Sequence, residues 1–146
     1  MAKVYVSGVI DIPVDKVWAY ARDFNGHHKW HPIIAESHVE DGKPSDQVGC
    51  VRNFTTTAGG HLRERLLTFS DVDRGFTYNI LVSPMPIENY VATFRCKPIT
   101  EGNRTFVEWF AEFDVAPEHE AGIKEQVARK TFADGILALA KAINGS

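Results

Sequence analysis

Residues 117–145 read PEHEAGIKEQVARKTFADGILALAKAING, and this stretch decides the fold. Pro117 suits the first turn of a helix, and Asn144-Gly145 is a typical C-terminal stop. Apolar residues recur between them at steps of three and four, as on one face of an α-helix. These residues are Ile123, Val127, Ala128, Phe132, Ile136, Leu139, Ala140 and Ile143. The stretch predicts one long amphipathic helix that needs a partner surface.

The residues before this helix predict that partner, an antiparallel sheet. Turn signals recur at strand-length intervals, at residues 40–45, 58–60, 71–75, 83–86 and 100–103. Runs rich in Val, Thr, Phe, Tyr and Ile lie between them, as strands require. Because the connections are short, roughly six consecutive strands should form an antiparallel meander.

The N-terminal segment predicts one further strand and two short helices. Residues 4–10 alternate as a strand, and Pro13 opens a helix. Phe24-Asn25-Gly26 ends that helix, and an aromatic, histidine-rich stretch at residues 27–32 leads to the meander. The helix residues that share an apolar face are Val14, Val17, Trp18 and Ala21.

Length and charge narrow the classes of function. One globular domain spanning residues 1–146 is expected, with 44% hydrophobic and 24% charged residues. A net charge of −3 provides no broad basic surface, so no nucleic-acid partner is expected.

The absence of a long apolar run or signal sequence predicts a cytoplasmic protein without integral membrane association. Cys50 and Cys96 lack CxxC spacing and are expected to be two buried thiols rather than a disulfide.

The predicted fold class is therefore α+β, with a curved antiparallel sheet wrapped around the long C-terminal helix. A strongly twisted sheet curls around a helix, and its inner face is too wide for one helix to fill. The remaining space is a natural cavity for a small hydrophobic or aromatic molecule.

Period-two alternation assigns side chains to the wall of that cavity. The expected ligand-binding residues are Arg52, Phe54, Glu64, Leu66, Tyr78, Ile80, Tyr90 and Phe94 on the sheet, with Phe132 and Ile136 on the helix. Arg52 and Glu64 either form an internal ion pair or meet a polar group of the ligand. Trp30 either guards the entrance or packs against the rim of the sheet.

For the last predicted strand, residues 104–114, the sequence allows two answers to which side chains point toward the cavity. Periodicity turns Trp109 inward and Glu108 outward. An outward-facing Trp109 and Phe113 would instead form an exposed apolar patch, typical of a protein-interaction module or homodimer. Both a monomer and a homodimer remain possible from the sequence.

Catalysis would have to use acid–base chemistry in the cavity, because no phosphate-binding loop or nucleophile elbow is present. The candidate groups are Glu64, Glu108, Tyr78 and Tyr90, with Arg52 to stabilise an oxyanion. His27, His28 and His31 lack companions at metal-ligand spacing, so neither a metal site nor another cofactor is expected.

Five segments together resemble the polyketide cyclase/dehydrase and lipid-transport superfamily of the START-like, helix-grip fold. Its relatives include the birch-pollen allergen family and the plant abscisic acid receptors. The resemblance covers nearly the whole chain and implies either binding of a ligand such as a lipid or polyketide or a polyketide cyclase/dehydratase-like activity. The segments are Asp23 through Trp30-His31-Pro32, Gly49-Cys50-Val51-Arg52, Glu64-Arg65-Leu66, Asn89-Tyr90 and Val107-Glu108-Trp109.

By resemblance to the abscisic acid receptors, the cavity should be lined by the positions Glu64, Tyr78, Ile80, Tyr90 and Phe110. This assignment turns Phe110 toward the cavity, opposite to the periodicity. The receptors' gate sequence, Ser-Gly-Leu-Pro-Ala, is absent from residues 57–60, and Met85-Pro86-Ile87 replaces their His-Arg-Leu latch. A hormone-receptor function is therefore not implied.

Overall fold

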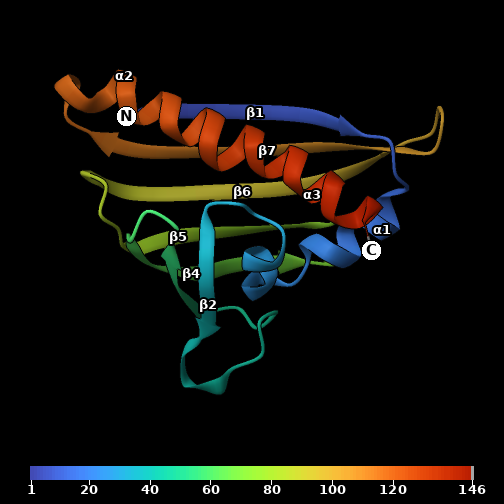
Figure 1. Ribbon diagram of the computed structural model, residues 1–146, viewed down its shortest axis with the longest axis horizontal. Helices are drawn as coiled ribbons and strands as arrows, with labels where there is room; N and C mark the ends of the chain where they lie inside the picture. Colours follow the sequence, from blue (N-terminus) through green and yellow to red (C-terminus); the bar gives the residue numbers. More distant parts are fainter. Residues whose placement is uncertain (146) are drawn as a thin grey trace.

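Seven strands form one antiparallel sheet in the computed structural model, which describes residues 1–145. The strands are β1 (Ala2–Ile10), β2 (Ile34–Val39), β3 (Val51–Thr56), β4 (His61–Ser70), β5 (Gly75–Val82), β6 (Ile87–Ile99) and β7 (Arg104–Val115). Their order in the sheet is β1-β7-β6-β5-β4-β3-β2. The six strands β2–β7 therefore form the predicted meander, and β1 pairs with the last of them. The sheet curves around the C-terminal helix (Figure 1).

Two short helical segments follow β1, as predicted. The first is α1 (Val14–Ala21), which buries the four residues of its predicted apolar face. The second is η1 (Phe24–Lys29), a 3₁₀ helix that contains His27 and His28. A third short segment, η2 (Glu40–Gly42), follows β2 at the predicted turn. The first two connect one edge of the sheet to the other.

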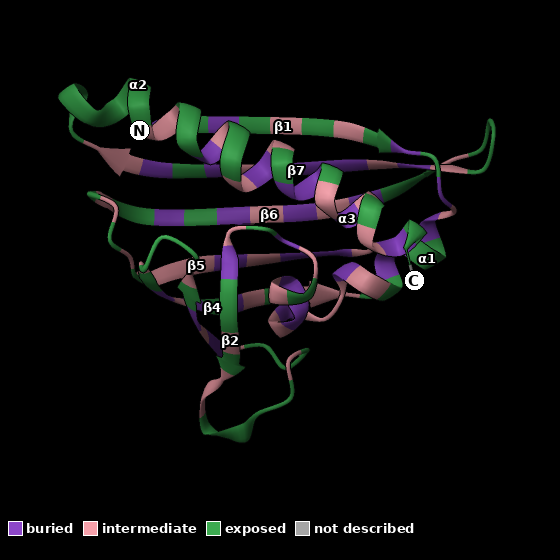
Figure 2. Cartoon of the chain, viewed as in Figure 1, coloured by how far each residue is buried: buried purple, intermediate pink, exposed green. Residues whose placement is uncertain are grey.

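The long C-terminal helix is continuous but not uniform. It consists of α2 (Pro117–Gln126), a π-helical segment η3 (Val127–Ala133) and α3 (Asp134–Asn144). In α3, Gly135, Ile136, Leu139 and Ile143 are buried, whereas α2 has no buried residue. Figure 2 shows this change along the helix. The helix is therefore packed against the sheet mainly through its C-terminal half.

Two glycines allow that close packing. A Cβ atom on Gly8 of β1 would lie 3.3 Å from Cγ2 of Ile136. A Cβ atom on Gly135 would lie 2.8 Å from Nε2 of His31 and 2.9 Å from Cζ3 of Trp109. Side chains at these positions would force the helix away from the sheet or displace two aromatic rings.

The cysteines are as predicted, because Cys50 and Cys96 are both free and buried. Burial raises the pKa of the Cys96 thiol to about 12, which keeps it protonated and unreactive. Among the helices of the described residues, none combines the length and the apolar character needed to cross a membrane.

Candidate functional site

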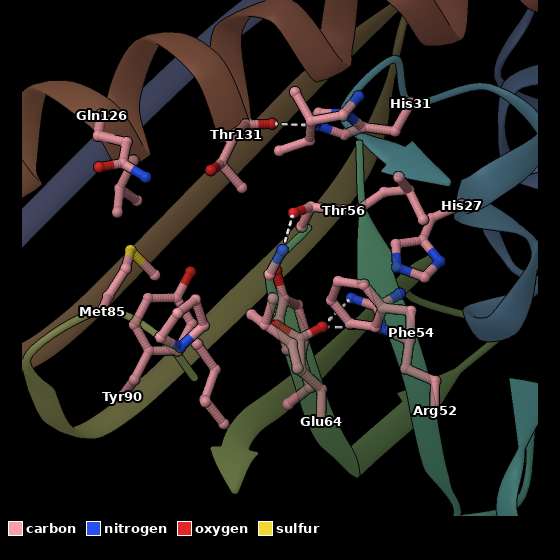
Figure 3. Close-up of a pocket in the computed structure, with 18 of the residues that line it drawn as sticks. His27, His31, Arg52, Phe54, Thr56, Glu64, Met85, Tyr90, Gln126 and Thr131 are labelled. Carbon is pink, nitrogen blue, oxygen red and sulfur yellow. Dashed lines mark hydrogen bonds and ion pairs between the residues drawn. The ribbon is translucent and has the colours of Figure 1, made fainter. Parts of the chain in front are cut away.

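A cavity of about 340 Å³ lies between the sheet and the middle of the C-terminal helix. Figure 3 shows it bounded by residues of η1, the strands and the helix. Its lining residues are His27, His31, Ile33, Ile34, Arg52, Phe54, Thr56, Ala58, Gly60, Leu62, Glu64, Tyr78, Ile80, Pro84, Met85, Tyr90, Trp109, Gln126, Val127 and Thr131. Ala58, Pro84 and Gln126 are exposed, so the mouth lies between the β3–β4 and β5–β6 turns and the end of α2.

Arg52 and Glu64 form an ion pair at the inner end of the cavity. They are directly opposite each other on β3 and β4, and both point to the inner face of the sheet. Nε of Arg52 donates to Oε1 of Glu64 at 2.8 Å, and Nη2 lies 2.6 Å from the same oxygen. Because both side chains are buried, each charge depends on the other for compensation. The predicted internal ion pair is confirmed.

The remaining contacts of Arg52 hold the guanidinium in place. Nη1 donates to the carbonyl oxygen of Phe24 at 2.6 Å, and the guanidinium carbon lies 3.9 Å from the centre of the Phe24 ring. The centre of the Tyr78 ring lies 4.8 Å from the guanidinium carbon. The arginine thus joins η1 to the sheet through charge, hydrogen bonding and cation–π contact.

Glu64 has one carboxylate oxygen that remains available. Both contacts with Arg52 use Oε1, and Oε2 has no hydrogen-bond partner among the described residues. Burial raises the pKa of this carboxyl group, although the charge and hydrogen bond of Arg52 oppose the effect. Glu64 therefore offers the cavity either an acceptor or, once protonated, a donor.

Aromatic side chains form the wall beside this ion pair. Nε1 of Trp109 donates to the hydroxyl oxygen of Tyr78 at 3.0 Å. Tyr78 and Tyr90 have ring centroids 6.4 Å apart. Burial raises the pKa of both tyrosines, so their hydroxyl groups stay neutral. This part of the wall combines apolar surface with two polar hydroxyl groups.

His31 links the start of β2 to the π-helical segment. Its Nε2 lies 2.7 Å from the carbonyl oxygen of Thr131, and the backbone N–H of Ile33 donates to its Nδ1 at 3.3 Å. These partners require a proton on Nε2 and none on Nδ1, which is a neutral tautomer. Burial lowers the pKa of His31, in agreement with that assignment. Both nitrogens are therefore occupied in holding the fold.

Six of the predicted wall residues line the cavity: Arg52, Phe54, Glu64, Tyr78, Ile80 and Tyr90. Four others are placed elsewhere: Leu66, Phe94, Phe132 and Ile136 are buried in the core and do not line the cavity. The physical reason is close packing: Phe132 stacks on Trp109, Ile136 approaches Gly8 of β1, and Phe94 meets Trp109 edge-on, so no space remains beside them. Sequence reasoning missed His27 and His31 as wall residues, because η1 has no simple periodicity that assigns a facing.

Trp30 does not lie at the entrance, and its ring contact is with Trp109 on the inner face of β7 and not with the rim of the sheet. It is partly buried against the core, with its ring centroid 6.3 Å from that of Trp109. It does not line the main cavity. The residue therefore packs beneath the site and does not guard the entrance.

The last strand follows the periodicity, and the facing taken from the resemblance is wrong. Trp109 and Phe113 are buried on the inner face, whereas Phe110 stacks on Tyr5 with a centroid distance of 5.8 Å. Phe110 therefore lies on the outer face of the sheet, away from the cavity. The exposed patch considered for Trp109 and Phe113 does not exist, because both side chains pack in the core.

Glu108 is also on the outer face, so it is not among the groups that converge in the cavity. Its carboxylate accepts hydrogen bonds from Tyr5 at 2.6 Å and from Arg95 at 2.9 Å. Burial alone would raise the pKa of Glu108, but the Tyr5 hydrogen bond and the charges of Arg95 and Lys97 outweigh burial and lower it. The other four candidate groups, Arg52, Glu64, Tyr78 and Tyr90, all line the cavity.

The histidines of η1 and its C-terminal end do not assemble a metal-ligand set. Within residues 1–145, no group of three or more His, Cys, Asp or Glu side chains is arranged to hold a metal ion.

One family and several solved structures match this chain. The family described as polyketide cyclase / dehydrase and lipid transport matches residues 1–144. XoxI from Bacillus cereus is 30% identical, with a TM-score of 0.86 over 99% of this chain and 96% of that one. A protein from Thermobifida fusca is 29% identical, with a TM-score of 0.87 over 99% of this chain and 95% of that one. No curated protein sequence matches.

A more distant similarity extends the fold to a plant enzyme. Norcoclaurine synthase from Thalictrum flavum, in complex with a transition-state analogue, is 13% identical over 98% of this chain and 94% of that one, with a TM-score of 0.76. At this identity the similarity shows the fold alone. From the match over residues 1–144, this chain belongs to the polyketide cyclase/dehydrase and lipid-transport family and has its START-like, helix-grip fold.

Proposed function

We propose that this chain binds a small, mostly apolar molecule in the cavity between β3–β5 and the C-terminal helix. The observation that carries the proposal is a cavity of about 340 Å³ whose wall is largely apolar and aromatic and whose inner end holds a few fixed polar groups. That combination is typical of sites for small molecules, in which apolar surface supplies affinity and polar groups orient the ligand.

The shape of the site supports a ligand of modest size. Its volume lies near the lower end of the usual range for small-molecule sites, roughly 300 to 1,000 Å³. Gln126 is exposed, and Thr131 is partly buried, so the helix edge of the mouth is polar. A compact ring system therefore fits the site better than a long acyl chain.

A neutral apolar dye, N-phenyl-naphthylamine, tests the proposal through its fluorescence increase on binding. Ile80→Trp should place an indole ring in the cavity and strongly reduce that increase, because Ile80 lines it. Val91→Trp is the matched control, since Val91 lies on β6 with 43% of its surface exposed, and it should bind like the unsubstituted chain. Equal dye binding by both variants, or no binding by the unsubstituted chain, would reject the proposal.

A further inference from the structure

His27 is a buried histidine in η1 that lies beside the candidate binding cavity. Its side chain is only 6% exposed, and its ring meets the Phe54 ring edge-on, with a centroid distance of 4.6 Å. The ring lines the main cavity and also a second cavity of about 10 Å³ behind it. The small cavity has room for no more than about one water molecule. A ligand can therefore reach the ring only from the main cavity.

Neither ring nitrogen of His27 has a hydrogen-bond partner among residues 1–145, although both are buried. Buried polar atoms in folded proteins are nearly always bonded, so two such atoms on one ring need a physical explanation. The neighbouring histidines differ. Nδ1 of His28 lies 2.9 Å from the carbonyl oxygen of Asn25, and both nitrogens of His31 are bonded.

The His27 ring is neutral. Burial lowers its pKa well below the ordinary value, and the positive charge of Arg52 lowers it further. A neutral imidazole has one N–H donor and one nitrogen acceptor. It can therefore donate to a carbonyl oxygen, or either donate to or accept from a hydroxyl group.

The charges around His27 disfavour an anionic ligand. Arg52 is the only lysine or arginine among the described residues that line the main cavity. Its charge is paired with Glu64, and Nη1 donates to the carbonyl oxygen of Phe24. The second oxygen of Glu64 has no partner and would repel a carboxylate or phosphate whenever Glu64 is ionised.

We infer that His27 is the hydrogen-bonding anchor for the ligand's polar atom, and that the ligand is a neutral molecule carrying a hydroxyl or carbonyl oxygen on an apolar ring system. The inference rests on the proposed function and specifies the class of ligand. The torsion about Cβ–Cγ of histidine is soft, so rotation about it can turn a ring nitrogen toward the cavity. Pairing with a ligand oxygen then removes the energetic cost of an unbonded buried nitrogen.

Three probes with the same ring system and different polar groups test this inference by displacing the bound dye: naphthalene, naphthol and naphthoate. Naphthol should bind about tenfold more tightly than naphthalene, the factor expected for one net hydrogen bond. Naphthoate should bind most weakly of the three. His27→Phe keeps an aromatic ring but removes both nitrogens, so naphthol should lose its advantage while naphthalene binds as before. His28→Phe, the matched control, should keep the advantage of naphthol.

The outcomes separate the two proposals. If all three probes displace the dye but naphthol has no advantage, or keeps it in His27→Phe, the inference about His27 is wrong and the proposed function stands. If naphthoate binds best, the assignment of a neutral ligand is wrong. If the dye itself does not bind, the proposed function fails and the inference with it.

A second measurement does not depend on whether His27→Phe folds. The ring-nitrogen NMR signals of His27 in the unsubstituted chain should shift when naphthol is added and stay in place when naphthalene is added. An unchanged His27 signal with saturating naphthol would overturn the inference.

Discussion

The space between sheet and helix has two halves that are built differently. In one half, α3 and Phe132 at the end of the π-helical segment pack on α1, β1 and β7, and Leu139 and Phe113 are fully buried among apolar neighbours. In the other half, Gln126, Val127 and Thr131 of the helix face β3–β5, and the cavity lies between them. We call these the packed half and the cavity half.

The difference follows from where the helix can approach the sheet. Gly8 and Gly135 remove side chains at the contact and let the helix come close in the packed half. The inner face near the cavity carries Arg52 and Glu64, which cannot be buried against an apolar helix without losing their polar environment. The packed half thus contributes stability, and the cavity half combines apolar surface with polar groups that can orient a ligand.

The largest expected effect comes from a substitution in the cavity half. Arg52→Met leaves the Glu64 carboxyl buried without its charge partner, which should lower the free energy of unfolding by about 3–5 kcal/mol. Denaturant titration measures this change. The matched control on the outer face is Arg95→Met, which should cost about 0–1 kcal/mol because Arg95 is half exposed and Glu108 keeps its bond from Tyr5. Equal losses in the two variants would show that the inner ion pair has no special dependence on burial.

A smaller effect is expected from disturbing the contact of the packed half. Gly135→Ala places a methyl group within 2.9 Å of the His31 and Trp109 rings, so it should destabilise the chain by about 1–3 kcal/mol. Gly122→Ala is the control in the same helix, because the added Cβ would meet no atom within 4 Å apart from the backbone and neighbours of its own helical turn. It should stabilise the chain by up to about 1 kcal/mol through helix propensity. Thermal unfolding of both variants measures the difference, and a stabilised Gly135→Ala would show that the close contact yields without cost.

Much of this arrangement was predictable from local patterns. Alternation along β3, β4 and β5 assigned Arg52, Glu64 and Tyr78 to one face, because the two-residue period of a strand fixes side-chain direction. The same rule applied to β7 placed Trp109 correctly, whereas the distant resemblance misplaced Phe110. Facing within a strand is therefore a local property that the sequence reveals directly.

Which helix residues line the cavity and which fill the core was not predictable in the same way. Apolar periodicity gives the same signal for Phe132 and Ile136, which fill the packed half, as for Val127, which lines the cavity. The local distance between helix and sheet decides between these outcomes, and it depends on non-local contacts. The π-helical segment and the position of His27 depend on the same contacts, so neither has a simple sequence period.

The smallest expected effect is a pH dependence of stability. It involves Glu64 and Glu108, two buried carboxyl groups on opposite faces of the sheet. The pKa of Glu64 is raised mainly by burial, so its contribution to stability is present below the ordinary value of 4.5 and is lost as pH rises through its folded pKa. The pKa of Glu108 is lowered because its Tyr5 and Arg95 partners outweigh burial. Its contribution is therefore present above the ordinary value and is lost as pH falls through its folded pKa.

The two glutamine variants should consequently differ from the unsubstituted chain in opposite directions. As pH rises from about 3 to about 7, the unsubstituted chain should become less stable relative to Glu64→Gln and more stable relative to Glu108→Gln. Urea unfolding at several pH values measures both differences. Slopes of the same sign would mean that Arg52 outweighs burial at Glu64. The cavity would then hold a permanently ionised carboxylate, which repels anionic ligands at every pH in this range.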